Sequence, residues 1–163
     1  MKEFKITKLT PNDMKYVKMM VQELAEFEKM PDGPKLSIEN FQADLKNNRF
    51  FGFIAMSEID DEPAGMALCY MAYSTWEGPF IHMEDLYVRP RFRKSGLGKN
   101  LVVAVCKEAK DKNYQRVQWN VLDWNPAREF YNKLGASNLS EKEGWLAYRL
   151  EPEQIAKIAS KEI

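Results

Sequence analysis

The sequence has few of the residues on which metal sites, disulfide frameworks and membrane spans depend. Its 163 residues include one histidine, His82, and two cysteines, Cys69 and Cys106. Two isolated thiols, each inside an apolar stretch, are too few for a disulfide framework or a zinc site, so both are predicted to be small core residues and no metal is expected. No window approaches the roughly eighteen apolar residues of a membrane-spanning helix.

An excess of charge of either sign is also lacking. Twenty-four Lys and Arg residues balance twenty-four Asp and Glu residues. A nucleic-acid partner and an anionic membrane surface both require concentrated positive charge, so neither is expected. The charged residues 1–9 do not resemble a signal peptide, which favours a cytoplasmic protein. The length, without linker or repeat, predicts a single domain over residues 1–163.

Hydrophobic periodicity predicts a chain of mixed strands and helices. Met14, Val17, Val21 and Leu24 have the spacing of one helix face, and Gly135 is placed to end a later helix. This order predicts an α/β or α+β layer in which helices pack on a mixed sheet. Strands are predicted at residues 3–9, 50–57, 64–73, 80–88, 115–122 and 144–150, and helices at about 11–24, 37–46, 95–109, 126–134 and within 151–163.

The clearest chemical pattern lies in residues 93–99 (RKSGLGK), between a predicted strand and a predicted helix. Amides in the first turn of a helix have no intrahelical acceptor, and the helix dipole favours an anion there. Gly96 and Gly98 would let phosphate oxygens approach the backbone, and three basic side chains of the segment add positive charge. The spacing alone is a weak signal and is more typical of a tight turn beside the sheet.

Residues 93–98 resemble the R/Q-x-x-G-x-G/A signature of the GNAT superfamily of N-acetyltransferases. Residues 124–136 (WNPAREFYNKLGA) resemble a second block of that family, in which an Asn precedes a helix that carries a Tyr. Segments 23–28, 83–85 and 141–145 resemble the branch that acetylates spermidine, spermine and thialysine, so the resemblance covers nearly the whole chain. It implies a central twisted mixed β-sheet flanked by helices. Within residues 73–76 (YSTW), the chain is similar to the thialysine-type members, because polyamine-type members carry an acid near Ser74.

This resemblance implies acetyl-CoA as the acetyl donor, with no metal and no covalent enzyme intermediate. The loop and helix start would hold the pyrophosphate, and the strand at residues 86–88 would bond the pantetheine arm through its backbone. The interval from Asn125 to Tyr131 is one residue shorter than in animal members, which leaves its register open. The residues implied to bind acetyl-CoA are Leu86, Tyr87, Val88, Arg93, Lys94, Ser95, Gly96, Leu97, Gly98, Lys99, Asn125, Pro126, Ala127 and Tyr131.

Acetyl transfer to a primary amine requires a group that accepts the amine's proton and a group that protonates the thiolate. Glu84, directly or through a water, is the candidate base, and Tyr131 is the candidate acid by resemblance. Adjacent strand residues point to opposite faces, so at most one of Glu84 and Asp85 is expected to face the site. A lone histidine is more often structural, and His82 is not the expected base.

The acceptor is a cation before it loses its proton, so its capture favours acidic and aromatic side chains. Each acid taken alone is more typical of a solvated surface position, and the prediction depends on all of them falling in matched segments. A small amine substrate and a homodimer are further implications of the resemblance. The residues expected at the substrate are Phe27, Glu28, Trp76, Glu84, Gln118, Trp119, Asn120 and Glu143.

Two other functions remain open at this point. The first is acetylation of protein lysines or N-termini, although acidic runs that would bind a peptide are not evident. The second is a catalytically inactive acyl-CoA-binding module that works through protein contacts. Such a module would keep Arg93, Gly96 and Gly98 and could dispense with Glu84 and Tyr131.

Overall fold

The computed structural model describes residues 4–160 and divides into two compact units, with the boundary between Asn120 and Val121. The first unit contains a five-stranded sheet in the order β1-β2-β3-β4-β5. Its first four strands are antiparallel to their neighbours, whereas β5 runs parallel to β4. The sheet is therefore mixed, as predicted. The strands are β1 (Phe4–Lys8), β2 (Phe51–Ser57), β3 (Glu62–Ser74), β4 (Gly78–Val88) and β5 (Val117–Gln118).

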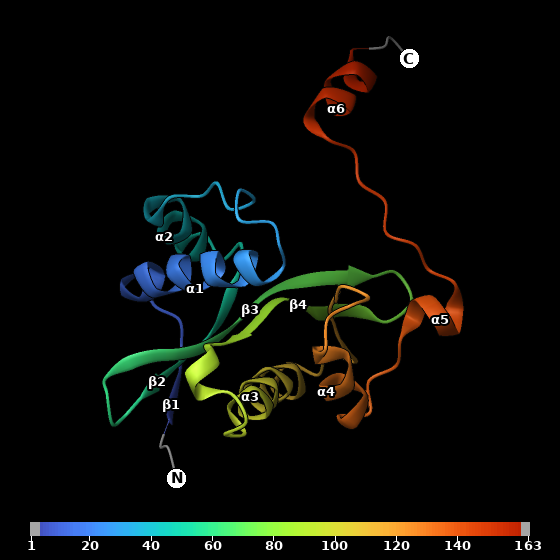
Figure 1. Ribbon diagram of the computed structural model, residues 1–163. Helices are drawn as coiled ribbons and strands as arrows, with labels where there is room; N and C mark the ends of the chain where they lie inside the picture. Colours follow the sequence, from blue (N-terminus) through green and yellow to red (C-terminus); the bar gives the residue numbers. More distant parts are fainter. Residues whose placement is uncertain (1–3, 161–163) are drawn as a thin grey trace. The chain divides into compact units, whose positions relative to one another are not determined.

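Helices cover both faces of this sheet (Figure 1). The α1 helix (Met14–Phe27) and α2 (Ile38–Lys46) lie on one face, and α3 (Leu97–Asp111) lies on the other. Short 3-10 turns, η1 (Pro11–Asp13) and η2 (Pro90–Phe92), precede α1 and α3. The Ser37 side chain accepts a hydrogen bond from the Asn40 amide and so caps α2.

The core between α1 and the sheet follows the predicted helical spacing. Met14 and Val17 are fully buried against Met66 and Leu68 of β3. Of the two cysteines, Cys69 is buried in β3, but Cys106 is exposed on α3. The core prediction for Cys106 is wrong because the residue directly follows the buried Val105, about 100° further round the helix.

The second unit holds three short helices, α4 (Ala127–Lys133), α5 (Leu139–Glu143) and α6 (Pro152–Ala159). The strand predicted at residues 144–150 is wrong, since no strand is assigned there in the described chain, and the strand predicted at 115–122 is reduced to Val117–Gln118. Both segments have an apolar alternating pattern, but a strand also requires a partner. No helix within residues 4–160 is long and apolar enough to cross a bilayer.

Candidate active site

The predicted anion-binding loop lies between η2 and α3. Gly96 is the N-cap of α3 and has a φ of 85°, in the left-handed region that a residue with a Cβ rarely adopts. The first helical hydrogen bond of α3 runs from the Asn100 amide to the Gly96 carbonyl, at 3.1 Å. The amides of residues 97–99 therefore precede the helical hydrogen-bond ladder. A helix start of this kind suits an anion, and the binding of one here stays a prediction.

Side chains of the loop fasten it to the end of β4. The Arg93 Nε donates to the Val88 carbonyl at 2.9 Å, and the Ser95 hydroxyl donates to the Phe92 carbonyl at 2.6 Å. The Arg93 guanidinium also lies 5.4 Å from the ring centre of Phe27 and 5.8 Å from that of Tyr87. Arg93 thus connects the loop to α1 and to the strand that carries Glu84.

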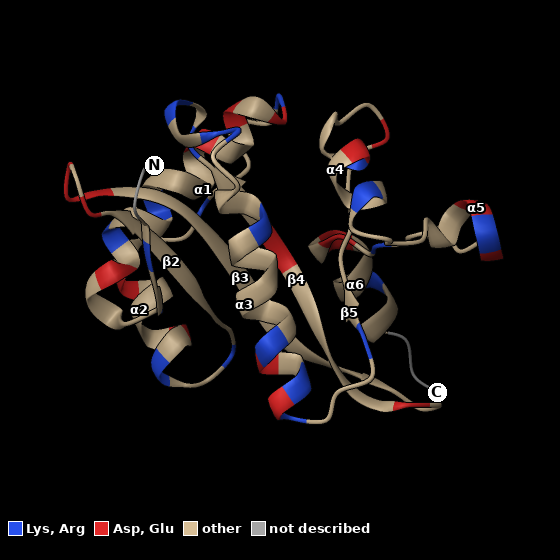
Figure 2. Ribbon diagram, turned by 90° about the horizontal axis from the view of Figure 1, so that it is seen from below, with Lys and Arg blue, Asp and Glu red and all other residues tan. Residues whose placement is uncertain are grey.

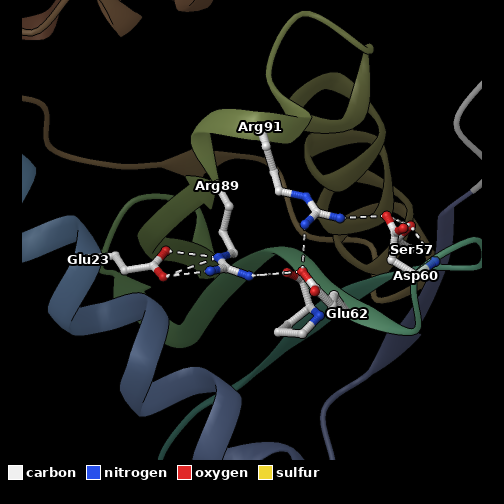
Figure 3. Close-up of polar contacts among 7 residues, drawn as sticks. Glu23, Ser57, Asp60, Glu62, Arg89 and Arg91 are labelled. Atoms are coloured by element: carbon white, nitrogen blue, oxygen red, sulfur yellow. Dashed lines mark hydrogen bonds and ion pairs between the residues drawn. The ribbon is translucent and has the colours of Figure 1, made fainter.

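A chain of ion pairs connects the residues just before this loop to α1 and to the turn between β2 and β3 (Figure 3). Arg89 pairs with Glu23 of α1 at 3.1 Å and with Glu62 at 3.7 Å. Glu62 also pairs with Arg91 at 3.1 Å, and Arg91 reaches Asp60 in the turn between β2 and β3. The sequence analysis missed this chain because its members lie in segments far apart in the sequence. Its effect is to place two arginines before the loop in fixed positions.

One edge of β4 is open beyond its short pairing with β5. Among the described pairings, β5 is in register only with Ile81 and His82. On the other edge, the segment Leu86–Val88 is fully paired with β3. The backbone of residues 86–88 thus lies on a partly open edge next to the loop, as β-augmentation by a ligand would require.

A β-bulge at Glu84 changes the directions in which the side chains of Glu84 and Asp85 point. This acidic pair on β4 appears as a red band in Figure 2. Leu68 pairs with Asp85 and Cys69 pairs with Met83, so Glu84 is the extra residue. Asp85 shares a face with His82, because their partners Leu68 and Tyr70 are two residues apart. Glu84 contacts His82 as well. The bulge therefore replaces the expected alternation and brings both carboxylates to one face.

The electrostatics confirm that acidic groups gather there. Burial, with smaller contributions from Glu84 and Glu28, raises the pKa of Asp85 to about 6. Burial also raises the pKa of Glu28, which follows the last residue of α1. Three carboxylates thus lie near one another on the face covered by α1, and together they favour a cation.

His82 and Tyr70 lie beside this cluster. They are cross-strand partners whose rings stack with centres 4.8 Å apart and planes 23° from parallel. The His82 Nε2 is 3.6 Å from a carboxylate oxygen of Glu84. Neither aromatic residue was predicted at the site, although the period of two along β4 could have placed His82 with Glu84.

Of the other predicted substrate residues in the first unit, some lie beside His82 and one lies far from the carboxylates. Gln118 is in register with His82, with Trp119 and Asn120 following it. Trp76, in contrast, lies in the connection at the tip of the β3–β4 hairpin and is 87% exposed. Glu84 is six residues along β4 from Gly78 at that tip, which corresponds to about 20 Å. Within one chain, Trp76 does not join the carboxylates.

The remaining predicted residues belong to the second unit. The Asn125 side-chain oxygen accepts a hydrogen bond from the Ala127 amide at 2.9 Å, which forms an Asx turn at the start of α4. Tyr131 lies in the middle of α4, partly buried, with its ring 5.3 Å from that of Phe130. Glu143 accepts a hydrogen bond from the Trp145 indole at 2.8 Å. The second unit thus contains a short helix that carries the candidate acid.

A mixed sheet covered on both faces, with a phosphate-type loop at the end of β4, is the arrangement of an acyl-CoA-dependent transferase. The description "Acetyltransferase (GNAT) family" matches residues 17–136, and the chain belongs to this family of N-acetyltransferases. It is 44% identical over 160 residues to the thialysine N-epsilon-acetyltransferase of Caenorhabditis elegans, covering 98% of this chain and 99% of that protein. The enzyme of the same name from Bos taurus is 38% identical over 151 residues, which are 87% of this chain and 89% of the relative.

Solved structures show the same fold at lower sequence identity. An aminoglycoside acetyltransferase from an uncultured soil metagenomic sample superimposes with a TM-score of 0.75 at 22% identity, covering 91% of this chain and 97% of that one. The glucosamine-6-phosphate N-acetyltransferase of Arabidopsis thaliana gives 0.69 at 20% identity, covering 92% and 97%. The predicted family and α/β fold class are confirmed.

Enzymes of this family generally use acetyl-CoA, and the loop fits its phosphates. A Cβ built on Gly96 would meet nothing within 4 Å, so the space in front of this residue is open. Lys94 and Lys99 are exposed next to the same helix end. Within residues 4–160, no group of three or more His, Cys, Asp or Glu residues is placed to hold a metal ion.

Proposed function

We propose that the chain transfers an acetyl group from acetyl-CoA directly to the primary amine of a small substrate. A thialysine-like amino acid is the first candidate, and diamines or polyamines are the second. The nearly full-length likeness to thialysine N-epsilon-acetyltransferases is the observation that carries this proposal. The absence of an acid at Ser74 also favours a short amino acid that brings its own carboxylate.

Acetyl-CoA would bind along β4 and at the start of α3. The proposed phosphate contacts are the amides after Gly96 and the side chains of Lys94 and Lys99, supported by Arg93 and Ser95. The pantetheine arm would bond the backbone of residues 86–88 on the open edge. From the second unit, Asn125, Pro126, Ala127 and Tyr131 are proposed by resemblance. Since Asn125 bonds the amide of the first residue of α4, its role would be to fix the start of the helix that carries Tyr131.

Glu84 is the proposed base. Primary amines with a pKa near 10 are mostly protonated at neutral pH, so a carboxylate must accept the proton before the nitrogen can attack. The Glu84 side chain is 60% exposed and can be reached by an amine or by a bridging water. Glu28 and Asp85 add negative charge that attracts the cation.

Tyr131 is the proposed acid. When bound, acetyl-CoA supplies the thioester whose C–S bond is exchanged for the amide C–N bond. The phenol of Tyr131 would donate its proton to the departing sulfur, and Glu84 would hold the proton taken from the amine. Phe27, Trp76, Gln118, Trp119, Asn120 and Glu143 are proposed to line the substrate, with Trp76 remote from Glu84 in its own chain.

The proposed enzyme is a homodimer formed by a single N-acetyltransferase domain. The family match from residue 17 to 136 spans the boundary between the two units and supports one domain. The exposed apolar residues at 144–150 support a second copy as partner. Cytoplasmic localisation stays a prediction from the sequence.

The decisive experiment measures acetyl-CoA consumption with thialysine, lysine, putrescine, spermidine and spermine as acceptors. We expect the highest kcat/KM with thialysine and a loss of about 100-fold or more in Tyr131→Phe, because the phenolic proton is removed. Glu84→Gln should lose activity to a similar extent.

Other outcomes would contradict specific parts of the proposal. A spermidine kcat/KM far above that for thialysine would exclude the thialysine-like substrate. Tight acetyl-CoA binding without turnover of any amine would indicate the binding-module function. Mass increments of 42 Da on proteins incubated with the enzyme, instead of on the small amines, would indicate protein acetylation.

A further inference from the structure

The only histidine in the chain is held beside the proposed base. His82 is 9% exposed, and its ring stacks on that of Tyr70 at 4.8 Å. Stacked rings on paired strands leave the imidazole little freedom to turn. Its position is therefore set by the sheet, independently of any substrate.

Glu84 lies beside this fixed ring. His82 and Glu84 are second neighbours on β4, and residues of this spacing share one face of a strand. In the structure, the His82 Nε2 is 3.6 Å from one carboxylate oxygen of Glu84. The His82 side chain is 11% exposed and that of Glu84 is 60% exposed, so an amine reaches Glu84 far more readily than His82.

We propose that His82 is a positioning residue for Glu84, in which the Nε2 side of the stacked imidazole holds one carboxylate oxygen and leaves the other for the amine. This proposal rests on the proposed function, in which Glu84 accepts the amine's proton. With Nε2 protonated, the neutral imidazole presents an N–H dipole to the carboxylate and favours its ionised form.

The surrounding groups are consistent with this role. Tyr70 faces the imidazole from β3, Glu84 faces it from β4, and the uncharged Gln118 is its register partner on β5. Asp85 and Glu28 add negative charge near Glu84. Burial lowers the pKa of His82 more than Glu84 raises it, so the neutral imidazole predominates at pH 7.5.

The first test follows the single imidazole by NMR during a pH titration, without substrate. In Glu84→Gln, the His82 pKa should fall by about half a unit or more, since the neighbouring negative charge is lost. Glu58→Gln makes the same chemical change in the turn after β2 and should leave the His82 pKa unchanged. An equal pKa in the wild type and in Glu84→Gln would overturn the proposal.

The second test compares two substitutions at His82. His82→Phe keeps a ring for stacking on Tyr70 but removes the N–H, whereas His82→Gln keeps an N–H donor. His82→Phe should lower kcat about tenfold, leave the KM for acetyl-CoA unchanged and move the acidic limb of the kcat/KM profile to higher pH. His82→Gln should recover part of the lost kcat.

The outcomes separate this inference from the proposed function. Equal losses in both variants, with an unchanged pH profile, would show that His82 only fills space. A wild-type enzyme that acetylates no amine would overturn the proposed function, while the NMR titration would still decide whether Glu84 and His82 are coupled.

Discussion

At the residue scale, Asp85 is the carboxylate whose environment departs furthest from water. It is partly buried opposite Leu68 on the face covered by α1, with Glu84 and Glu28 near it. Burial and these like charges raise its pKa from the usual 3.8 to about 6. The folded protein therefore pays a cost when Asp85 ionises, which suits a group that stabilises a bound cation.

This cost predicts a pH-dependent effect of Asp85→Asn. Between pH 4 and 6 the native state binds more protons than the unfolded state, so wild-type stability falls as the pH rises and stays lower above pH 6. Asp85→Asn should therefore raise the free energy of unfolding by about 2 kcal/mol at pH 7.5, allowing for partial exposure, and by much less at pH 4. Urea denaturation at both pH values measures this difference.

The exposed Asp111 at the end of α3 provides the matched control. Asp111→Asn should change the free energy of unfolding at pH 7.5 far less than Asp85→Asn does, because Asp111 is exposed. A destabilised Asp85→Asn at pH 7.5 would contradict the cost assigned to the buried carboxylate.

Gly96, Glu84 and Asp85 show which features of the site could be predicted from the sequence and which could not. Gly96 was predicted correctly at the start of α3, because local chain geometry decides whether a glycine is needed there. Glu84 and Asp85 were predicted on opposite faces, but the bulge brings them to one face. A bulge depends on how two strands pair, and one strand's sequence does not encode this pairing.

At the scale of secondary-structure elements, the first four strands and all the assigned helices except α5 were predicted to within a few residues. Their boundaries depend on local signals, such as the Ser37 cap and the turn between β2 and β3. The sequence did not predict that β5 would be so short or that residues 144–150 would be unpaired. Strand pairing at both places depends on distant parts of the chain or on another chain. The links between elements, above all Glu23 to Arg89, are equally invisible in the sequence.

This link predicts a measurable loss of stability in Glu23→Gln. Glu23 pairs with Arg89 at 3.1 Å, and both side chains are only about a quarter exposed. Glu23 also accepts a hydrogen bond from Tyr87, whose pKa is raised by burial and by Glu23. Removing the charge should lower the free energy of unfolding by about 1 to 2 kcal/mol, because Arg89 loses a partly desolvated partner.

The same substitution at a more exposed pair is the control. Glu141, paired with Arg128 at 3.1 Å, is 72% exposed, so Glu141→Gln should cost less than about 0.5 kcal/mol. Thermal unfolding at low and high salt would measure both effects. Equal losses in the two variants would show that the Arg89 pair contributes no more than an ordinary surface ion pair.

At the scale of the whole molecule, the C-terminal part of the chain exposes more apolar surface than an isolated subunit is expected to leave in water. Leu146, Tyr148 and Leu150 alternate along an extended segment, with exposures of 74%, 91% and 56%. Residues of this spacing share one face of a strand. The sequence pattern predicted a strand here, and a second copy of the chain could supply the partner that a strand needs.

The homodimer proposal therefore predicts that Tyr148→Asp weakens self-association. A charge on the apolar face of the segment should lower the association constant at least tenfold, since burying an unpaired carboxylate costs more than the roughly 1.4 kcal/mol that this factor represents. Ala147→Asp adds the same charge on the opposite face and should have a much smaller effect. Sedimentation velocity over a range of concentrations measures all three proteins. A wild type that stays monomeric would refute the homodimer, and equal association of all three proteins would place the interface elsewhere.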